Sequence, residues 1–481
     1  MRYTLTRSLY LVALVAFLYG LADGAGILIV YFGGTGSDLS AMTPLNLVKK
    51  DTAGGANRWI DAGTTGKGNT GAAGSPTATS PLTFSSGVVA CPTCVTGPAS
   101  TNILFVGVGT TYVGQYAPWG GEATWTGYGT GLMTVRPWSG GFIRNLGTTT
   151  LTSMSSGVLQ SIRVGVNSPN MTTFSGFKEP PIMVMGGMAA GTSITDYTNS
   201  VRFMAGSRIG VIAQQVGSVT SNAVTGAITA EMGLDDGSGI YMGADPAATT
   251  ITAGSTNYLP PFGRSSGTGF PMVTAGTFSI LCGAPASNGT GGTPARMTLQ
   301  VDEVDSVLYA DLGAGVTNYC DISAQTVHVN VGQRIRTKWV NNRTTSITIG
   351  GWSAKFVPDS GATVGVIGGE NGDALSGTQY WRPGRYTSQP NLTFGAVIVP
   401  RAGVVTKGCI TTSGTLASGI LVRLYKNGVF QDTLLTTTTA SGVETQCGST
   451  ISVTFAKGDL LAVQTIYTSG NANMDMWGIN F

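Results

Sequence analysis

The sequence predicts an all-β protein with three tandem jelly-roll or β-sandwich domains, which follow an apolar N-terminal segment and a Gly/Ser/Thr-rich linker. A short strand pattern occurs three times and runs up to Gly206, Gly332 and Gly458, which are spaced 126 residues apart. Within each copy apolar residues alternate with polar ones, as is typical of a strand with one buried face. A period of this length indicates a duplicated domain, because it is far too long for a solenoid unit.

Composition and length agree with this class. A chain of 481 residues is expected to hold three or four domains, and its 72 glycines favour many turns. Charged residues make up only 10% of the chain, against roughly 25% in ordinary globular domains. The net charge of +3 is small, and no basic cluster exists beyond Lys49-Lys50. We therefore expect no nucleic-acid partner, since binding would need a basic stripe.

Residues 1–40 form an apolar N-terminal segment that differs from the rest of the chain. A basic start precedes an apolar stretch of 14 residues, Leu9–Ala22, and a second apolar run follows at 27–32. Three interpretations stay open: an anchor buried within an assembly, a secretory signal peptide, or a membrane anchor. In the first, the side chains that mediate assembly are Leu9, Leu11, Leu14, Phe17, Ile27, Ile29 and Tyr31.

Residues 41–100 are rich in Gly, Ala, Thr, Ser and Pro and are expected to be a linker arm. The arm contains Cys91-Pro-Thr-Cys94. A zinc site would need two further ligands, and His328 is the only histidine in the chain. A small loop closed by its own disulfide, or a link between chains, is the favoured interpretation of this motif.

The three domains are expected at residues 101–236, 237–359 and 375–481, with a short linker at 360–374. Each contains six to eight short apolar runs separated by turn residues, which is the pattern of a β-sandwich or jelly roll. In the first domain, Val201–Ala213 is expected to be an inner strand, with a bend, bulge or tight turn at its glycine. No amphipathic helix longer than about two turns follows residue 40, which excludes α/β folds.

Cysteine spacing supports the repeat. Cys282 and Cys320 are 38 residues apart, and so are Cys409 and Cys447. The pairs occupy equivalent places in domains two and three, so we predict one disulfide in each, joining neighbouring strands. Each bridge should stabilise its domain by about 3–4 kcal/mol. The alternative is a pair of buried free thiols. Disulfides would indicate an oxidising environment.

The sequence offers little for catalysis. With one histidine, no Ser-His-Asp or Cys-His arrangement can be built. The acid pairs Asp235-Asp236 and Asp302-Glu303 could act in glycoside hydrolysis or bind calcium, but they lie in turn-like segments and are expected to be solvated. No phosphate-binding glycine loop opens a helix. We therefore predict a protein that is not an enzyme, with no catalytic residues, metal or cofactor.

The third domain resembles the jelly-roll modules of bacteriophage tail fibres, head fibres and spikes, which are similar in topology to the C1q and tumour-necrosis-factor folds. The segments that carry the resemblance are Phe394–Gly403, Ser413–Leu416, Val422–Gly428, Val453–Asp459 and Trp477–Phe481. Separately, Gly33–Ser40, with its Gly-Gly-Thr-Gly run, resembles a segment that recurs in bacteriophage tail-fibre and virion-appendage proteins. The second domain resembles these modules more loosely, and the first departs from them.

The resemblance implies a homo-oligomeric, usually trimeric, virion appendage. Its expected partners are other virion proteins and a host surface glycan or protein, and its expected location is the virion surface or the extracellular space. Two other classes stay open: a capsid or extracellular filament building block, and a secreted bacterial surface adhesin. In the appendage residues 9–32 are expected to pack against other chains and the domains to meet side by side, whereas in the adhesin the N-terminal segment would direct secretion.

Overall fold

The computed structural model divides the chain into two units, Met1–Pro81 and Leu82–Phe481. It describes most of residues 136–481 and several segments before them. The earlier segments are 48–51, 58–61, 83–85, 88–90, 102–108, 115–117, 119 and 122–123. The gaps after 136 are 151–158, 168–181, 187–191, 217–224, 245–248, 263–266, 286, 288, 314–318, 322–323, 361–364, 371–373, 385–391, 438–439 and 468.

Short hairpins lie in the segment expected to be a linker arm. In the first unit β1 (Val48–Asp51) pairs antiparallel with β2 (Arg58–Asp61). In the second unit β3 (Thr83–Ser85) pairs in the same way with β4 (Val88–Ala90).

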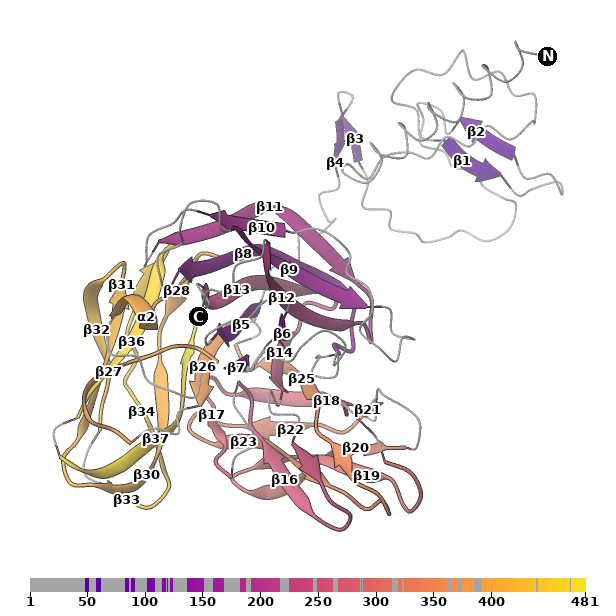
Figure 1. The fold of residues 1–481 in the computed structure, drawn as a ribbon. Coiled ribbons are helices and arrows are strands. Elements are labelled where there is room, and N and C mark those ends of the chain that lie inside the picture. Colours follow the sequence, from indigo (N-terminus) through magenta and orange to yellow (C-terminus); the bar gives the residue numbers. More distant parts are fainter. Residues whose placement is uncertain are drawn as a thin grey trace. The chain divides into compact units, whose positions relative to one another are not determined.

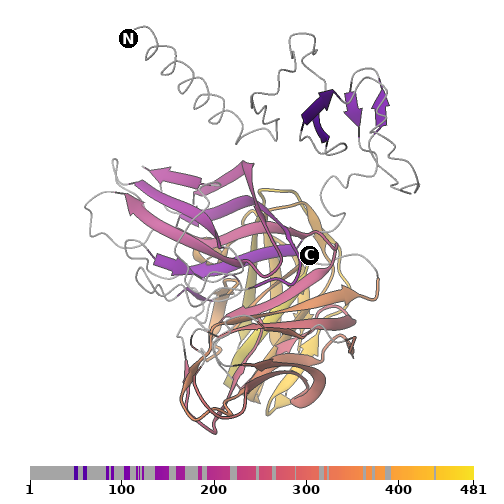
Figure 2. The same cartoon turned by 90° about the vertical axis from the view of Figure 1, so that its right-hand side faces the viewer.

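The all-β prediction is confirmed. Among the described residues the only helix is α2 (Leu392–Gly395). The strands from β5 onward fall into three groups along the chain, which we call repeat 1 (β5 to β13), repeat 2 (β14 to β25) and repeat 3 (β26 to β37). Each group occupies its own region in Figure 1 and in the view turned by 90° (Figure 2), where colour follows the sequence. Each repeat is therefore a contiguous stretch of chain folded on itself.

The strands of repeat 1 are β5 (Asn102–Val108), β6 (Gln115–Ala117), β7 (Glu122–Ala123), β8 (Gly141–Thr150), β9 (Leu159–Asn167), β10 (Ile182–Gly186), β11 (Ser193–Phe203), β12 (Arg208–Val216) and β13 (Thr225–Leu234). Those of repeat 2 are β14 (Gly239–Ala244), β15 (Thr250–Ile251), β16 (Thr256–Leu259), β17 (Phe270–Pro271), β18 (Gly276–Ala284), β19 (Ala295–Val301), β20 (Val304–Leu312), β21 (Tyr319–Asp321), β22 (Val327–Val329), β23 (Arg334–Val340), β24 (Ile347–Thr348) and β25 (Gly351–Pro358). Those of repeat 3 are β26 (Val366–Glu370), β27 (Gly377–Trp381), β28 (Val397–Ile398), β29 (Gly403–Val405), β30 (Gly408–Leu416), β31 (Ile420–Lys426), β32 (Val429–Thr436), β33 (Ala440–Ser441), β34 (Glu444–Cys447), β35 (Val453–Phe455), β36 (Leu460–Tyr467) and β37 (Gly470–Asn480).

All three repeats share one strand order. Each has an inner sheet (β5-β13-β8-β11, β14-β25-β18-β21 and β26-β37-β30-β34) and an outer sheet (β6-β12-β9-β10, β16-β23-β19-β20 and β27-β36-β31-β32). When the eight main strands of a repeat are numbered along the chain, the inner sheet reads 1-8-3-6 and the outer sheet 2-7-4-5. Pairing is antiparallel throughout these two sheets.

The two sheets of a repeat face each other across an apolar core. In repeat 3, residues of the inner sheet (Ile410, Trp477) and of the outer sheet (Val422, Val463) line one small cavity. All four are buried. Alternation along the strands produces this core, because successive side chains point to opposite faces of a sheet. Fully burying such side chains stabilises the fold by about 1.5–3 kcal/mol each.

The repeated glycine occupies the same turn in every repeat. Gly206, Gly332 and Gly458 have φ of 74°, 88° and 95°, which is the left-handed region that favours glycine. Their N–H groups donate to the carbonyls of Pro137, Met272 and Val399 at 2.7, 2.8 and 2.9 Å. The predicted equivalence of the three glycines is therefore confirmed.

Two expectations about strand boundaries need correction. The inner strand predicted at Val201–Ala213 is two strands, β11 of the inner sheet and β12 of the outer sheet, because the turn at Gly206 sends the chain across the core. The linker predicted at 360–374 contains β26, which pairs with β37. Its glycines concealed this strand: Gly368 and Gly369 leave no room for side chains, since an added Cβ at Gly368 would lie 2.6 Å from the Phe270 ring.

Candidate functional site: the outer face of repeat 3

The outer sheet of repeat 3 presents three aromatic side chains on its solvent side. Tyr380 belongs to β27, Tyr425 to β31 and Phe430 to β32. On β31, Val422 and Leu424 are buried, whereas Arg423 and Tyr425 between and after them are partly exposed. This alternation is the reason that Tyr425 points away from the core.

The rings form a continuous edge-to-face series. The Tyr380 and Tyr425 centroids lie 6.2 Å apart with planes at 68°, and those of Tyr425 and Phe430 lie 5.9 Å apart at 67°. These separations and angles are the preferred geometry of aromatic pairs. The Arg423 guanidinium lies 5.3 Å from the centre of the Phe430 ring. Phe430 is 47% exposed, so this apolar ring is available to a partner.

Gln464 of β36 holds the two tyrosines in place. The Tyr425 hydroxyl donates to Gln464 Oε1 at 3.0 Å, and Gln464 Nε2 donates to the Tyr380 hydroxyl at 2.7 Å. Gln464 is only 4% exposed, so its amide is a fixed bridge. Gly395 of α2 packs beside Tyr380, since an added Cβ there would lie 2.6 Å from the tyrosine Cβ. The platform of Tyr380, Gln464, Tyr425, Phe430 and Arg423 is therefore ordered before any partner binds.

Repeat 2 carries a related but more polar outer face. The Arg336 guanidinium stacks 4.1 Å from the Tyr258 ring centre, and its Nε donates to Gln300 Oε1 at 2.8 Å. Burial lowers the pKa of Arg336. Asp305 accepts hydrogen bonds from Lys338 (2.9 Å) and Gln300 (2.6 Å), which hold its carboxyl pKa below the ordinary value although burial acts to raise it. These charges are satisfied within the sheet.

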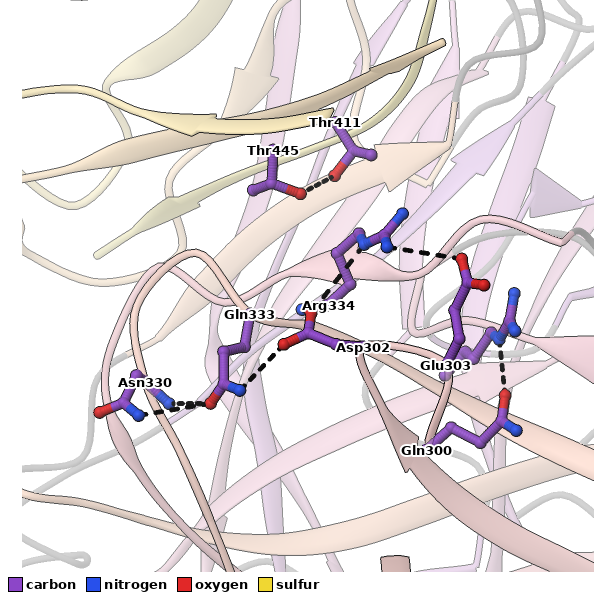
Figure 3. Close-up of polar contacts among 9 residues, drawn as sticks. Gln300, Asp302, Glu303, Asn330, Gln333, Arg334, Thr411 and Thr445 are labelled. Atoms are coloured by element: carbon purple, nitrogen blue, oxygen red, sulfur yellow. Dashed lines mark hydrogen bonds and ion pairs between the residues drawn. The ribbon is translucent and has the colours of Figure 1, made fainter. Parts of the chain in front are cut away.

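The acid pair Asp302-Glu303 lies in the β19–β20 hairpin and supports its turn (Figure 3). Asp302 accepts hydrogen bonds from the Arg334 N–H at 2.8 Å and from Gln333 Nε2 at 2.9 Å. Glu303 Oε1 lies 3.4 Å from Arg334 Nη2. Both acids have left-handed φ, 48° and 69°. In repeat 3 Asn427 and Gly428 adopt the same left-handed conformation, and Asn427 Oδ1 likewise accepts from the N–H that starts the seventh strand.

The other candidate residues are also engaged in local structure. Asp235 pairs with Arg202 at 3.0 Å, and Asp236 pairs with Lys355 at 3.0 Å. His328 Nε2 lies 3.0 Å from Asp359 Oδ2, and both side chains are about half exposed. In the part of the chain that the structure describes, no group of three or more His, Cys, Asp or Glu side chains is arranged to hold a metal ion.

Both predicted disulfides are present. Cys282 bonds to Cys320 and Cys409 to Cys447, and each pair lies directly opposite on neighbouring strands of the inner sheet. In repeat 1 the corresponding cross-strand position holds Gly147, opposite Thr195.

The remaining predicted sites fall outside the described residues. These are Cys91, Cys94 and the apolar residues Leu9, Leu11, Leu14, Phe17, Ile27, Ile29 and Tyr31. Among the residues described, no helix has the length and apolar character needed to cross a membrane.

Comparison of the chain with protein-family models and with curated proteins finds no match to either. The interpretation of the site therefore depends on its geometry.

Sequence reasoning missed the aromatic platform. Tyr380, Tyr425 and Phe430 come from three different strands, and no short motif contains them. The available signal was the run Arg423-Leu-Tyr425, whose alternate members both point outward on a strand.

Proposed function

We propose that this chain is a non-enzymatic virion structural protein, a fibre, spike or decoration appendage, that binds a host surface glycan or protein through its repeats. In this proposal it self-associates through residues 1–40 and contacts other virion proteins. The observation that carries the proposal is the ordered aromatic platform on the outer face of repeat 3. The binding role is inferred from this site, since one fold serves many functions, and the virion setting from the resemblance of the third domain to phage appendage modules.

The strand order supports jelly-roll repeats. A jelly roll places eight strands in two sheets through Greek-key connections. The orders 1-8-3-6 and 2-7-4-5 have this property, because strands distant in the chain are neighbours in both sheets. A five-bladed β-propeller would also contain many small antiparallel sheets. Each of its blades, however, would be built from one short local run of strands, and the pairing of β26 with β37 favours the jelly roll instead.

The chemistry of the platform favours recognition of a partner surface. Tyrosine offers a large, rigid and amphipathic contact area at a small cost in conformational entropy. Tyrosine and arginine are also enriched among residues that dominate binding energy. The bridge through Gln464 fixes both tyrosine rings, which reduces the ordering cost of binding. Aromatic faces next to hydroxyl and amide groups suit a sugar ring, which has apolar faces and a polar rim.

The disulfides support a location outside a reducing compartment. Such bonds persist in oxidising environments and on virion surfaces. Among the described residues two are present, one in repeat 2 and one in repeat 3.

Binding of the full-length protein to arrays of bacterial surface glycans and to intact cells tests the proposal. The informative variant is Phe430→Ala, which removes the most exposed ring of the platform and leaves the sheet intact. We expect at least a tenfold loss of affinity, equivalent to about 1.4 kcal/mol. Val443→Ala is the matched control, because Val443 is also 47% exposed but lies between β33 and β34.

Three results would contradict the proposal. Equal binding by wild type and Phe430→Ala would show that the platform does not contact the partner. Failure to bind any cell or glycan, together with assembly into a closed shell or a filament seen by electron microscopy, would favour the capsid or filament class. Secretion of the protein by a cell with no particle present would favour the adhesin.

A further inference from the structure

One segment of each repeat lies against the next repeat. The segment precedes the third strand and carries the carbonyl that accepts from the repeated glycine, at Pro137, Met272 or Val399. In repeats 2 and 3 it includes the short strands β17 and β28, which pair with the seventh strand of their own sheet.

The segment of repeat 1 meets the inner sheet of repeat 2. The Ser353 hydroxyl of β25 donates to the carbonyl of Arg136 at 2.9 Å. Phe105 of repeat 1 also packs on Phe262 of repeat 2, with ring centres 4.8 Å apart.

The segment of repeat 2 meets the inner sheet of repeat 3. The Phe270 ring lies over Gly478 of β37, where an added Cβ would come within 2.5 Å of it. The turn at Gly332 also contacts repeat 3, since a Cβ added to Gly332 would lie 3.7 Å from Cys447 Sγ of the disulfide there. Thr268 donates to Asp475 of β37 at 3.3 Å.

The segment of repeat 3 meets the inner sheet of repeat 1. The Thr229 hydroxyl of β13 donates to the carbonyl of Ile398 at 2.7 Å. The Ile398 side chain covers Gly147 of β8, and a Cβ added to Gly147 would lie 3.2 Å from Ile398 Cβ. The glycine turn again contributes, because Lys457 Nζ lies 4.2 Å from the centre of the Tyr197 ring on β11.

The positions that the incoming segment contacts are equivalent in the three inner sheets. Thr229, Ser353 and Gly478 pair with Gly147, Cys282 and Cys409 at matching points of the eighth and third strands. The contact is therefore one head-to-tail interface used three times. Head-to-tail contacts generate a ring when the rotation closes, and the step from repeat 3 back to repeat 1 closes it.

We propose that the three repeats of one chain form a closed intramolecular trimer, in which each repeat takes the place of a subunit. Every inner sheet is then covered from within the same chain and is not available to a second copy. Association between chains must use other surfaces, with residues 1–40 the candidate segment. The repeats of one chain therefore do not meet those of another chain through their inner sheets. This inference does not depend on the receptor.

The double variant Gly147→Cys with Ile398→Cys tests ring closure in the full-length chain. Cβ atoms bridged by a disulfide lie about 3.5–4.5 Å apart, so the two positions need only a small shift. All three atoms nearest the added Cβ belong to Ile398, and replacing this residue removes two of them. We expect a disulfide between repeats 3 and 1 within one chain, seen as a linked peptide pair in a protein that keeps its monomer mass on a non-reducing gel.

Each alternative outcome is distinct. Disulfide-linked dimers or trimers joined through residues 147 and 398 would mean that repeats are exchanged between chains, which overturns the proposal. Two free thiols at these positions in a folded protein would mean that the ring is open. The single variants are controls for pairing with native cysteines.

A second variant covers the case in which the first fails to fold. Lys457 is exposed and contacts Tyr197 of repeat 1, so a photoreactive benzoylphenylalanine can replace it with little disturbance. Irradiation should link position 457 to β11 around Tyr197 in the same chain. Mixing ¹⁴N- and ¹⁵N-labelled chains before irradiation separates this result from a link between chains, which would contradict the proposal.

Discussion

The hydroxyl of Thr229 in repeat 1 donates a hydrogen bond of 2.7 Å to the main-chain carbonyl of Ile398 in repeat 3, 169 residues away. Thr229 is 1% exposed, so neither water nor a surface group can replace this bond. It joins the first repeat to the last. A buried polar group left without its partner costs more than the bond itself contributes, which makes this residue a sensitive test of the junction.

Thr229→Val should lower the free energy of unfolding by about 1–3 kcal/mol, because it keeps the shape of the side chain but leaves the Ile398 carbonyl without its donor. Thr229→Ser keeps the hydroxyl and should lose less. Urea denaturation followed by tryptophan fluorescence measures both. Equal stability of the valine variant and wild type would show that the bond contributes nothing.

Cys409→Ala with Cys447→Ala should lower the free energy of unfolding by about 3–4 kcal/mol, the cost of freeing a loop of this length in the denatured chain. The corresponding change at Cys282 and Cys320 should have a similar effect, since both bridges span 38 residues. Thermal unfolding with and without reductant provides the measurement. Thiol labelling of the unreduced wild-type protein at these four positions would contradict both bridges.

Tyr241→Phe should leave stability unchanged or raise it. Tyr241 is 1% exposed, sits among Phe262, Phe278 and Phe356, and its hydroxyl has no hydrogen-bond partner among the described residues. Burial also raises the pKa of this phenol. Removing an unpaired buried hydroxyl relieves a desolvation cost of about 1–3 kcal/mol. A fall of the melting temperature by several degrees would reveal a partner for the hydroxyl.

Asp475 should make stability depend on pH in the acidic range. Burial raises the pKa of its carboxyl, although hydrogen bonds from Ser413 and Thr268 act in the opposite direction. The folded pKa of Asp475 therefore lies above the unfolded value of about 3.9. The stabilisation that the protonated carboxyl provides is complete below the unfolded pKa and is lost as pH rises through the folded pKa.

Asp475→Asn should therefore flatten the profile of urea midpoint against pH and raise the midpoint above pH 6 relative to wild type. Asp311→Asn is the control, because Asp311 is exposed on β20 and its partner Arg296 lies on the same sheet. The same slope in wild type and Asp475→Asn would show that this carboxyl does not govern the acidic profile.

The all-β class, the three-fold repeat and both disulfides followed from the sequence because each is recorded in spacing along the chain. Alternation fixes which face of a strand is buried, and equal spacing of Cys282–Cys320 and Cys409–Cys447 places each pair on neighbouring strands. The repeated glycine marked a turn because only its left-handed φ, 88° at Gly332, suits the crossing between sheets.

Only the tertiary structure decided what covers the inner sheets and which outward side chains form a surface. Gly147 has no sequence feature that connects it with Ile398, yet its missing side chain admits the last repeat onto the first. Tyr380, Tyr425 and Phe430 likewise meet only because β27, β31 and β32 belong to one sheet with β36 between the first two. Spacing along a chain encodes local conformation and strand pairing, whereas contacts between repeats depend on the shapes of surfaces that exist only after each repeat has folded.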